Sequence, residues 1–269
     1  MKNPSPDRVA IEEGIVVGDA GGRPLLADVF TPPGPVANGA GVLLVHGGGW
    51  TSGDRKQLHG YGILLGRTGY TCVAAEYRLA DEAKWPAMID DVRATFDWMR
   101  ANAGELEIDR DRIAVEGNSA GAHLALMLAG TAKPRELAAC IAIYAPSDLT
   151  SNGPRSEAWA LRAANESNAA REMLGGTEDE VRAQASPITY ASGSFPPTML
   201  ISGNADELVN VEHSLRMYRA LIDAGAKAEM HIFEGQPHAF DREPAFGRQC
   251  AALMTLFLNR HVRAAVAAK

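Results

Sequence analysis

The sequence predicts an α/β fold built on a mostly parallel sheet, and two observations carry this prediction. Short apolar runs, β-branched in part, recur at 41–46, 70–76, 112–116, 137–144, 197–202 and 227–233. Such runs suit strands that are covered on both faces. Helical patterns separate them, and this alternation favours parallel strands joined by right-handed crossovers. The length of 269 residues allows one large α/β domain or two small ones.

A β-hairpin is expected before the alternating region begins. The segments 9–17 and 25–30 flank Gly21-Gly22, which predicts two paired strands at a sheet edge. After Pro32-Pro33-Gly34-Pro35 the pattern changes to strands alternating with helices. One helix is expected after Trp85-Pro86, where residues recur at helical spacing: Met88, Val92, Thr95, Phe96 and Met99.

One long interval breaks the alternation. Between Ser147 and Phe195 the sequence is polar or helical, as in Glu157-Ala158-Trp159-Ala160-Leu161, and contains no good strand pattern. Connections of this length in compact domains are usually functional or disordered.

Composition excludes several classes of function. The chain is 46% hydrophobic and 22% charged, which is ordinary for a soluble globular protein, and its net charge of −7 offers no basic face for nucleic acid. Cys72, Cys140 and Cys250 lie far apart, so we expect free thiols, buried for the first two. No CxxC or HExxH spacing occurs, and we expect no metal. No apolar segment has the length of a membrane span or a leader, so a cytoplasmic location is the default.

A candidate nucleophile lies between a strand pattern and a helical pattern. The segment Gly117-Asn118-Ser119-Ala120-Gly121 follows the run at 112–116 and precedes helical sequence at 123–129. Glycines at both ends leave room for a sharp turn that exposes the hydroxyl at the end of a sheet. A serine that only caps the helix is the alternative. As a nucleophile, Ser119 needs a neighbouring base to take its proton.

His238 is the candidate base. It follows the run at 227–233 in a loop of sequence Gly235-Gln236-Pro237-His238, and an imidazole can accept a proton and return it near neutral pH. The other six histidines occur in strand or helical patterns, at the start of a glycine loop, or near the end of the chain.

Asp206 is the candidate acid that orients the base. It follows the run at 197–202, and a carboxylate can fix the imidazole tautomer and stabilise the imidazolium. Glu207, Asp223 and Asp241 are alternatives for this role.

With these residues in view, the chain resembles the α/β-hydrolase superfamily, and more narrowly the hormone-sensitive-lipase-like esterases and the feruloyl-esterase and acetyl-esterase group. The resemblance runs from about Val9 to the last residues, and its motifs are His46-Gly47-Gly48-Gly49-Trp50, Tyr77-Arg78-Leu79, Trp85-Pro86, Gly117-Asn118-Ser119-Ala120-Gly121 and Ala185-Ser186-Pro187. The chain order Ser119, Asp206, His238 is the order used by that fold, and Gly203-x-x-Asp206-x-x-Val209 matches the pattern around its acid.

The resemblance implies an α/β-hydrolase fold over 1–269, with helices on both faces of the sheet and a small cap at 147–195. A surface excursion without a role is the alternative for that segment. It also implies an oxyanion hole formed by the backbone N–H groups of Gly48, Gly49 and Ala120. Trp50 and Trp159 are expected at the substrate pocket, with core packing as the alternative.

The function implied by the resemblance is hydrolysis of short- to medium-chain acyl esters, a small-molecule substrate class, through an acyl-enzyme and without cofactor or metal. An arylformamidase or another amide or peptide hydrolase is one alternative, and a non-catalytic binding module is another. Two residues depart from the usual family pattern: Asn118 stands where an acidic residue or glycine is common, and Glu116 stands where an apolar or small residue is common. A homodimer is expected from base rates alone.

Overall fold

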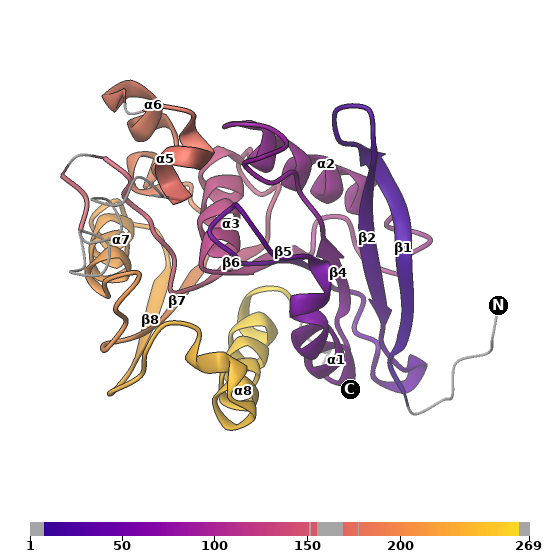
Figure 1. The fold of residues 1–269 in the computed structure, drawn as a ribbon. Coiled ribbons are helices and arrows are strands. Elements are labelled where there is room, and N and C mark those ends of the chain that lie inside the picture. The colour runs from indigo at the N-terminus through magenta and orange to yellow at the C-terminus, as the bar shows by residue number, and fades with distance from the viewer. Residues whose placement is uncertain (1–7, 151, 155–168, 177, 264–269) are drawn as a thin grey trace.

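An eight-stranded sheet forms the centre of the molecule (Figure 1). The computed structural model describes residues 8–150, 152–154, 169–176 and 178–263. The strand order is β1-β2-β4-β3-β5-β6-β7-β8. The strands are β1 (Ala10–Asp19), β2 (Pro24–Thr31), β3 (Gly41–Val45), β4 (Thr71–Ala75), β5 (Ile113–Asn118), β6 (Ala139–Ile143), β7 (Thr198–Gly203) and β8 (Ala228–Phe233).

The predicted mostly parallel sheet and its edge hairpin are confirmed. β1 pairs antiparallel with β2, β2 pairs antiparallel with β4, and every other neighbouring pair is parallel. The main difference from the sequence-based bounds is at β5, which continues through Asn118 instead of ending at 116. Gly117 therefore pairs with Val45 of β3, and the sharp turn begins only at Ser119.

Helices cover both faces of the sheet (Figure 1). One face carries α1 (His59–Arg67) and α8 (Pro244–His261), and the other carries α2 (Ala87–Ala101), α3 (Ala120–Thr131) and α7 (Glu212–Asp223). α8 begins at Pro244, where a residue without an N–H is tolerated in the first turn. It ends with Arg260 and His261, and a cationic side chain is favourable near a helix C-terminus.

Two hydrophobic clusters lie on opposite faces of the sheet. β3 shows the principle, because all five of its residues are buried and successive side chains point to opposite faces. Leu43 and Val45 join the cluster under α2 and α3, while Val42 and Leu44 join the cluster under α1 and α8. Cys72 and Cys140 are buried free thiols, as expected, and Cys250 is a buried free thiol as well.

The described part of 147–195 contains short helices and no strand. These are α5 (Ala169–Leu174), α6 (Asp179–Gln184) and the 3₁₀-helix η3 (Pro187–Tyr190). The N–H of Trp85 donates to the carbonyl of Met173 at 2.9 Å, which ties α5 to the loop before α2. In Figure 1, α5 and α6 lie beyond α3, toward the end of the molecule that carries α7.

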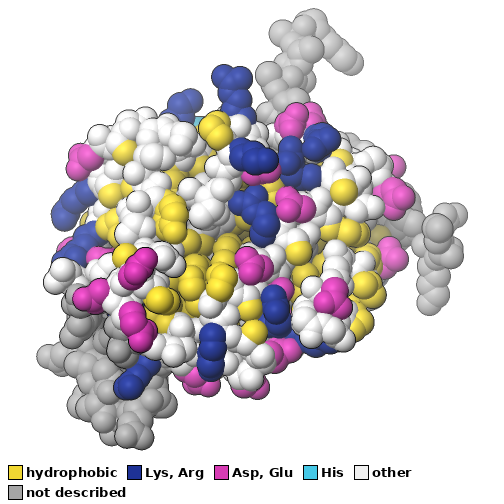
Figure 2. All heavy atoms as spheres, turned by 90° about the horizontal axis from the view of Figure 1, so that it is seen from above, with side chains coloured by type: hydrophobic (Ala, Val, Ile, Leu, Met, Phe, Trp, Pro, Cys, Tyr) yellow, Lys and Arg dark blue, Asp and Glu magenta, His cyan; other side chains and the backbone are white. Residues whose placement is uncertain are grey.

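The surface seen from above mixes both signs of charge. Figure 2 shows Lys and Arg side chains interspersed with Asp and Glu around a middle region where hydrophobic side chains are visible. Among the described residues, no helix combines the length and apolar character needed to cross a bilayer.

Candidate active site

Ser119 occupies a strained turn between β5 and α3. Its φ and ψ are 54° and −117°, outside the regions favoured by L-residues, and its N–H donates to the carbonyl of Ile143 at 2.9 Å. Glycine is required on both sides, because a Cβ on Gly117 would lie 2.4 Å from Gly121 and a Cβ on Gly121 would lie 2.0 Å from the carbonyl oxygen of Val45. The residue types of the motif therefore permit the turn that presents the hydroxyl.

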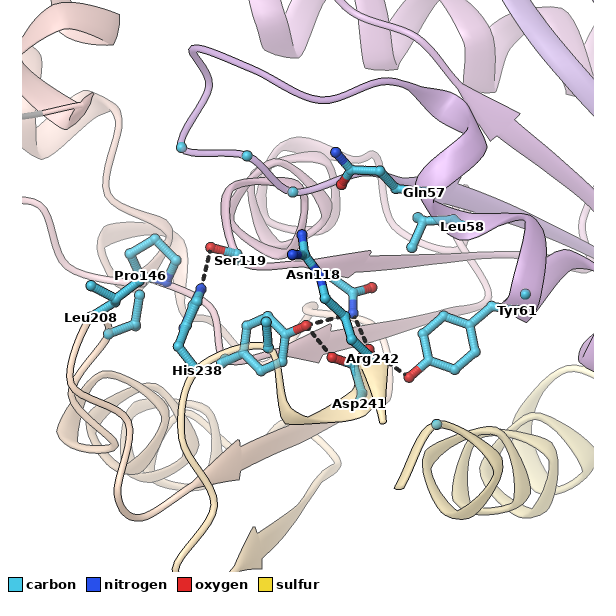
Figure 3. Close-up of a pocket in the computed structure, with 18 of the residues that line it drawn as sticks. Gln57, Leu58, Tyr61, Asn118, Ser119, Pro146, Leu208, His238, Asp241 and Arg242 are labelled. Carbon is cyan, nitrogen blue, oxygen red and sulfur yellow. Dashed lines mark hydrogen bonds between the residues drawn. The ribbon is translucent and has the colours of Figure 1, made fainter. Parts of the chain in front are cut away.

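The structure brings Ser119, His238 and Asp206 together at the ends of three strands. His238 Nε2 lies 3.0 Å from Ser119 Oγ, and His238 Nδ1 lies 2.7 Å from Asp206 Oδ2 (Figure 3 draws the first contact). A carboxylate accepts only, so Nδ1–H donates to Asp206 and Nε2 is left to accept the serine proton. This is the geometry that general-base activation of a hydroxyl requires.

Asp206 is held by its own loop. Its side chain is fully buried, and Oδ1 accepts the N–H groups of Leu208 at 2.9 Å and Val209 at 2.8 Å. One carboxylate oxygen is thus fixed by backbone and the other faces His238. Neither Asp223 nor Asp241 contacts His238 through a hydrogen bond in the described chain, so the geometry favours Asp206 among the candidates.

The glycine loop after β3 lies against this turn. A Cβ on Gly47 would meet the carbonyl oxygen of Asn118 at 2.8 Å, so the two backbones touch. Gly48 has φ +123°, and a Cβ there would lie 2.0 Å from the carbonyl oxygen of Ser52. Within the described chain, the amides of Gly48 and Gly49 donate to no protein acceptor. The amide of Ala120 is in the first turn of α3, where helix geometry supplies no acceptor.

His46 supports the loop and is not part of the reacting group. Its Nδ1–H donates to the carbonyl of Gly47 at 2.8 Å, and its ring stacks on Tyr77 with centroids 4.2 Å apart. The hydroxyl of Tyr77 donates to the carbonyl of His46 at 3.0 Å. Burial lowers the pKa of His46 to about 4, so the ring is neutral at physiological pH.

Trp50 belongs mainly to the core. It borders the cavity, but it is only 3% exposed, and its indole N–H donates to His123 Nδ1 at 3.3 Å. His123 in turn donates through Nε2 to the carbonyl of Ala185 at 2.7 Å, which joins the glycine loop to the segment before η3. Trp159 lies outside the described residues.

A buried polar cluster next to the site was not anticipated. Asp241, in the 3₁₀-helix η4 (Phe240–Arg242), accepts hydrogen bonds from Tyr61 at 2.7 Å, from Asn118 Nδ2 at 2.6 Å and from Tyr144 (Figure 3). Asn118 Nδ2 also donates to the hydroxyl of Tyr144 at 2.9 Å. The only sequence signal for this cluster is the unusual Asn118 beside the nucleophile.

Glu116 lies deeper on the same strand. It is fully buried, and neither carboxyl oxygen has a hydrogen-bond partner among the described residues. Burial, reinforced by the nearby carboxylate of Asp241, raises the pKa of Glu116 well above its usual value. Burial therefore favours the neutral carboxylic acid form of Glu116.

The candidate nucleophile and base open into one cavity of about 1010 Å³. Ser119 and His238 line it together with the glycine loop, and Ala169 of α5 forms part of its wall. Within the described parts of the chain, no group of three His, Cys, Asp or Glu side chains is arranged to hold a metal ion. The arrangement can perform acyl transfer through a serine nucleophile.

Comparisons with known proteins point to the same chemistry. The BD-FAE family model matches residues 27–221. The chain is 30% identical over 253 residues to esterase LipC of Mycobacterium tuberculosis, covering 87% of this chain and 60% of that protein. It is also 30% identical over 234 residues to an ethyl acetate hydrolase of Pseudomonas putida, covering 82% of this chain and 73% of that protein.

The fold has a counterpart among solved structures. Propionate-bound Est2, an esterase of Thermogutta terrifontis, superposes with a TM-score of 0.77 at 24% identity, covering 96% of each chain. At this identity the likeness establishes the fold alone, which is that of the α/β-hydrolases. The chain spans about 60% of the length of LipC and LipQ, two of the curated relatives that it matches.

Proposed function

Because this chain belongs to the BD-FAE family, within the α/β-hydrolase superfamily, we propose that it is a serine hydrolase of carboxylic esters. One observation carries the proposal: a continuous chain of contacts from Ser119 through His238 to Asp206 opens into a cavity beside unpaired backbone amides. The esterase relatives support the reaction class.

The reaction follows from this geometry. Ser119 Oγ attacks the ester carbonyl while His238 Nε2 takes its proton, and Asp206 stabilises the imidazolium. The N–H groups of Gly48, Gly49 and Ala120 are placed to stabilise the oxyanion, an effect worth about 3 kcal/mol for a single donor. His238 then returns the proton to the leaving alcohol, and a water molecule releases the acid by the same sequence of steps.

Short- to medium-chain acyl esters are the proposed substrates. The cavity of about 1010 Å³ is at the upper end of the range for small-molecule sites. A relative that is an ethyl acetate hydrolase and a neighbour that binds propionate favour short acyl groups. The segment 147–195 is proposed as a small cap, since Ala169 reaches the cavity wall.

The decisive experiment compares wild type with Ser119→Ala on p-nitrophenyl esters from acetate to palmitate. We expect Ser119→Ala to lower kcat/KM by about 10⁴-fold or more without changing Tm. A fluorophosphonate probe should label wild type at Ser119, as shown by peptide mass spectrometry. Ser194→Ala, a substitution of an exposed serine, is the control. Full activity in Ser119→Ala would refute the proposal, and faster turnover of matched formamides or anilides would move the function to amide hydrolysis.

A further inference from the structure

The cavity extends beyond Ser119 into a groove between α1 and α8. From α1 it is lined by residues at helical spacing, Gly60, Ile63, Leu64 and Arg67, and from α8 by Pro244, Gly247 and Arg248. Residues three and four apart share one helix face, so each helix presents a continuous strip to the groove. The apolar residues Ile63, Leu64 and Pro244 are part of this lining.

Three arginines line this same cavity. They are Arg67 on α1, Arg242 in η4 and Arg248 on α8, and all three side chains are exposed. In Figure 3 the side chain of Arg242 extends from η4 into the pocket. Across the described residues, none of the three guanidinium groups has a carboxylate or carbonyl partner. By contrast, Arg55 and Arg78 each hold a carboxylate at 2.7 Å.

Asp241 does not neutralise these arginines by pairing with them. It is the one carboxylate among the described residues that line the cavity. Its two oxygens accept hydrogen bonds from Tyr61, Asn118 and Tyr144, all of which lie on the pocket side of α1 or at the carboxyl ends of the strands. The cavity is therefore lined by three guanidinium groups and by one carboxylate that is already hydrogen-bonded. The net charge of the chain, in contrast, is −7.

We propose that the ester substrates of this site carry an anionic group, such as a carboxylate, which the groove binds through Arg67, Arg242 and Arg248. This inference rests on the proposed esterase function and names its substrate class. A guanidinium group presents a planar fork of donors that matches a carboxylate, and it stays charged at every relevant pH. A positive cavity in an acidic protein also concentrates anionic substrates.

The order of residues along α1 favours an anion that is separated from the reacting carbonyl by a short chain. Arg67 lies six residues after Tyr61 on α1, which corresponds to about 9 Å along the helix axis. Ile63 and Leu64 lie between these two residues on α1, and Tyr61 is linked through Asp241 to Asn118, which precedes the nucleophile. An ester whose apolar chain ends in a carboxylate would place methylene groups on Ile63 and Leu64 and its charge at the arginines.

The test compares matched esters that differ in charge. Monomethyl adipate and methyl hexanoate have the same acyl chain length. The acyl chain of the first ends in a carboxylate, and that of the second carries no charge. 4-Acetoxybutanoate and butyl acetate make the same comparison on the alcohol side. The measured quantity is the ratio of kcat/KM for the anionic ester to that for the neutral ester. We expect a ratio above one in one of the two arms, and the arm identifies which part of the ester enters the groove.

The variants Arg67→Gln, Arg242→Gln and Arg248→Gln should lower this ratio, with about a tenfold loss for the arginine closest to the anion. Arg219→Gln, which removes the same charge from an exposed position on α7, should leave the ratio unchanged. Added sodium chloride should reduce the ratio in wild type, because salt screens exposed charges.

The outcomes separate the two proposals. If the neutral esters are hydrolysed but the ratio is one or lower in both arms, or the arginine variants leave it unchanged, the inference is wrong and the esterase function stands. If no ester is hydrolysed and the fluorophosphonate probe does not label Ser119, the proposed function itself fails.

Discussion

The ring of Tyr144 lies against the imidazole of His238, with centroids 4.6 Å apart, while its hydroxyl donates to Asp241. Through this arrangement the candidate base is packed on a side chain that belongs to a hydrogen-bonded cluster. Asn118, next to the nucleophile, donates to both Tyr144 and Asp241. The packing of the imidazole of His238 therefore depends on a cluster that also holds the end of β5.

Tyr144→Phe should keep the ring on His238 but remove the hydroxyl. We expect the free energy of unfolding to fall by about 1–2 kcal/mol, because a buried hydrogen-bonded group loses its partners. The value of kcat should change little, whereas Tyr144→Leu, which also removes the aromatic face, should lower kcat. Urea unfolding and steady-state kinetics on a neutral ester give both quantities. Equal kcat values in the two variants would show that the ring does not position the base.

Gly48→Ala should damage the glycine loop. The new Cβ would lie 2.0 Å from the carbonyl oxygen of Ser52, and φ at this position is +123°, which L-residues rarely adopt. We expect kcat/KM to fall by about 100-fold or more, since the loop amides would no longer face the oxyanion. Gly104→Ala is the matched control, because a Cβ there meets nothing within 4 Å. Wild-type activity in Gly48→Ala would exclude this loop from the oxyanion hole.

Glu116→Gln should change how stability depends on pH. Burial raises the pKa of Glu116 in the folded state, so the unfolded chain binds fewer protons above about pH 4.5. The stability of wild type should then fall with rising pH through this group, by up to about 1.4 kcal/mol per pH unit until the folded pKa is reached. The variant lacks this slope.

Urea unfolding of both proteins between about pH 4 and pH 8 checks this prediction. The stability of Glu116→Gln relative to wild type should increase steadily across that range. If the free energy of unfolding of both proteins depended on pH in the same way, Glu116 would be ionised in the folded protein.

Asp28→Asn should have the opposite pH dependence. Burial acts to raise the pKa of Asp28, but hydrogen bonds from Arg55 at 2.7 Å, His59 at 2.8 Å and the N–H of Gly14 at 2.8 Å lower it overall. The stability that this carboxylate contributes is present above its unfolded pKa of about 3.9 and is lost as pH falls below that value.

At pH 7 we therefore expect Asp28→Asn to lose about 1.5–3 kcal/mol, because Arg55 and His59 both lose their contact with a buried carboxylate and Arg55 keeps only Glu76. Near pH 3 the difference between variant and wild type should shrink. Urea unfolding at the two pH values measures it, and a constant difference would show that the ion pair does not govern acid stability.

Much of the fold could be predicted from local patterns. The parallel strands are short, and those at the centre of the sheet, such as β3 and β6, are fully buried, so their apolar runs are clear in the sequence. Ser119, His238 and Asp206 each follow such a run, and parallel strands end at the same edge of the sheet. Their proximity could thus be inferred, while their catalytic roles, the homodimer and the cytoplasmic location stay predictions.

The cluster around Asp241 could not be predicted in the same way. Tyr61 and Asp241 are separated by 180 positions, and no periodic pattern connects them. The sequence offers Asp241 only as an alternative to Asp206, whereas in the structure it is a separate acceptor for Tyr61, Asn118 and Tyr144. The two departures that stood out, Glu116 and Asn118, now have structural descriptions: one is a buried carboxyl group with a raised pKa, and the other is a donor in the cluster.

β8 is the last strand of the sheet, and among the described strands it pairs with β7 alone. Its residues are mostly half-buried, in contrast to the fully buried strands of the centre. Edge elements with few buried contacts open at a lower free energy cost than the whole domain. Since the loop that carries His238 follows β8, fraying of this edge would displace the base while the nucleophile and the core stay in place. We therefore expect heat inactivation to precede global melting, with the peripheral strand β8 setting the temperature at which activity is lost.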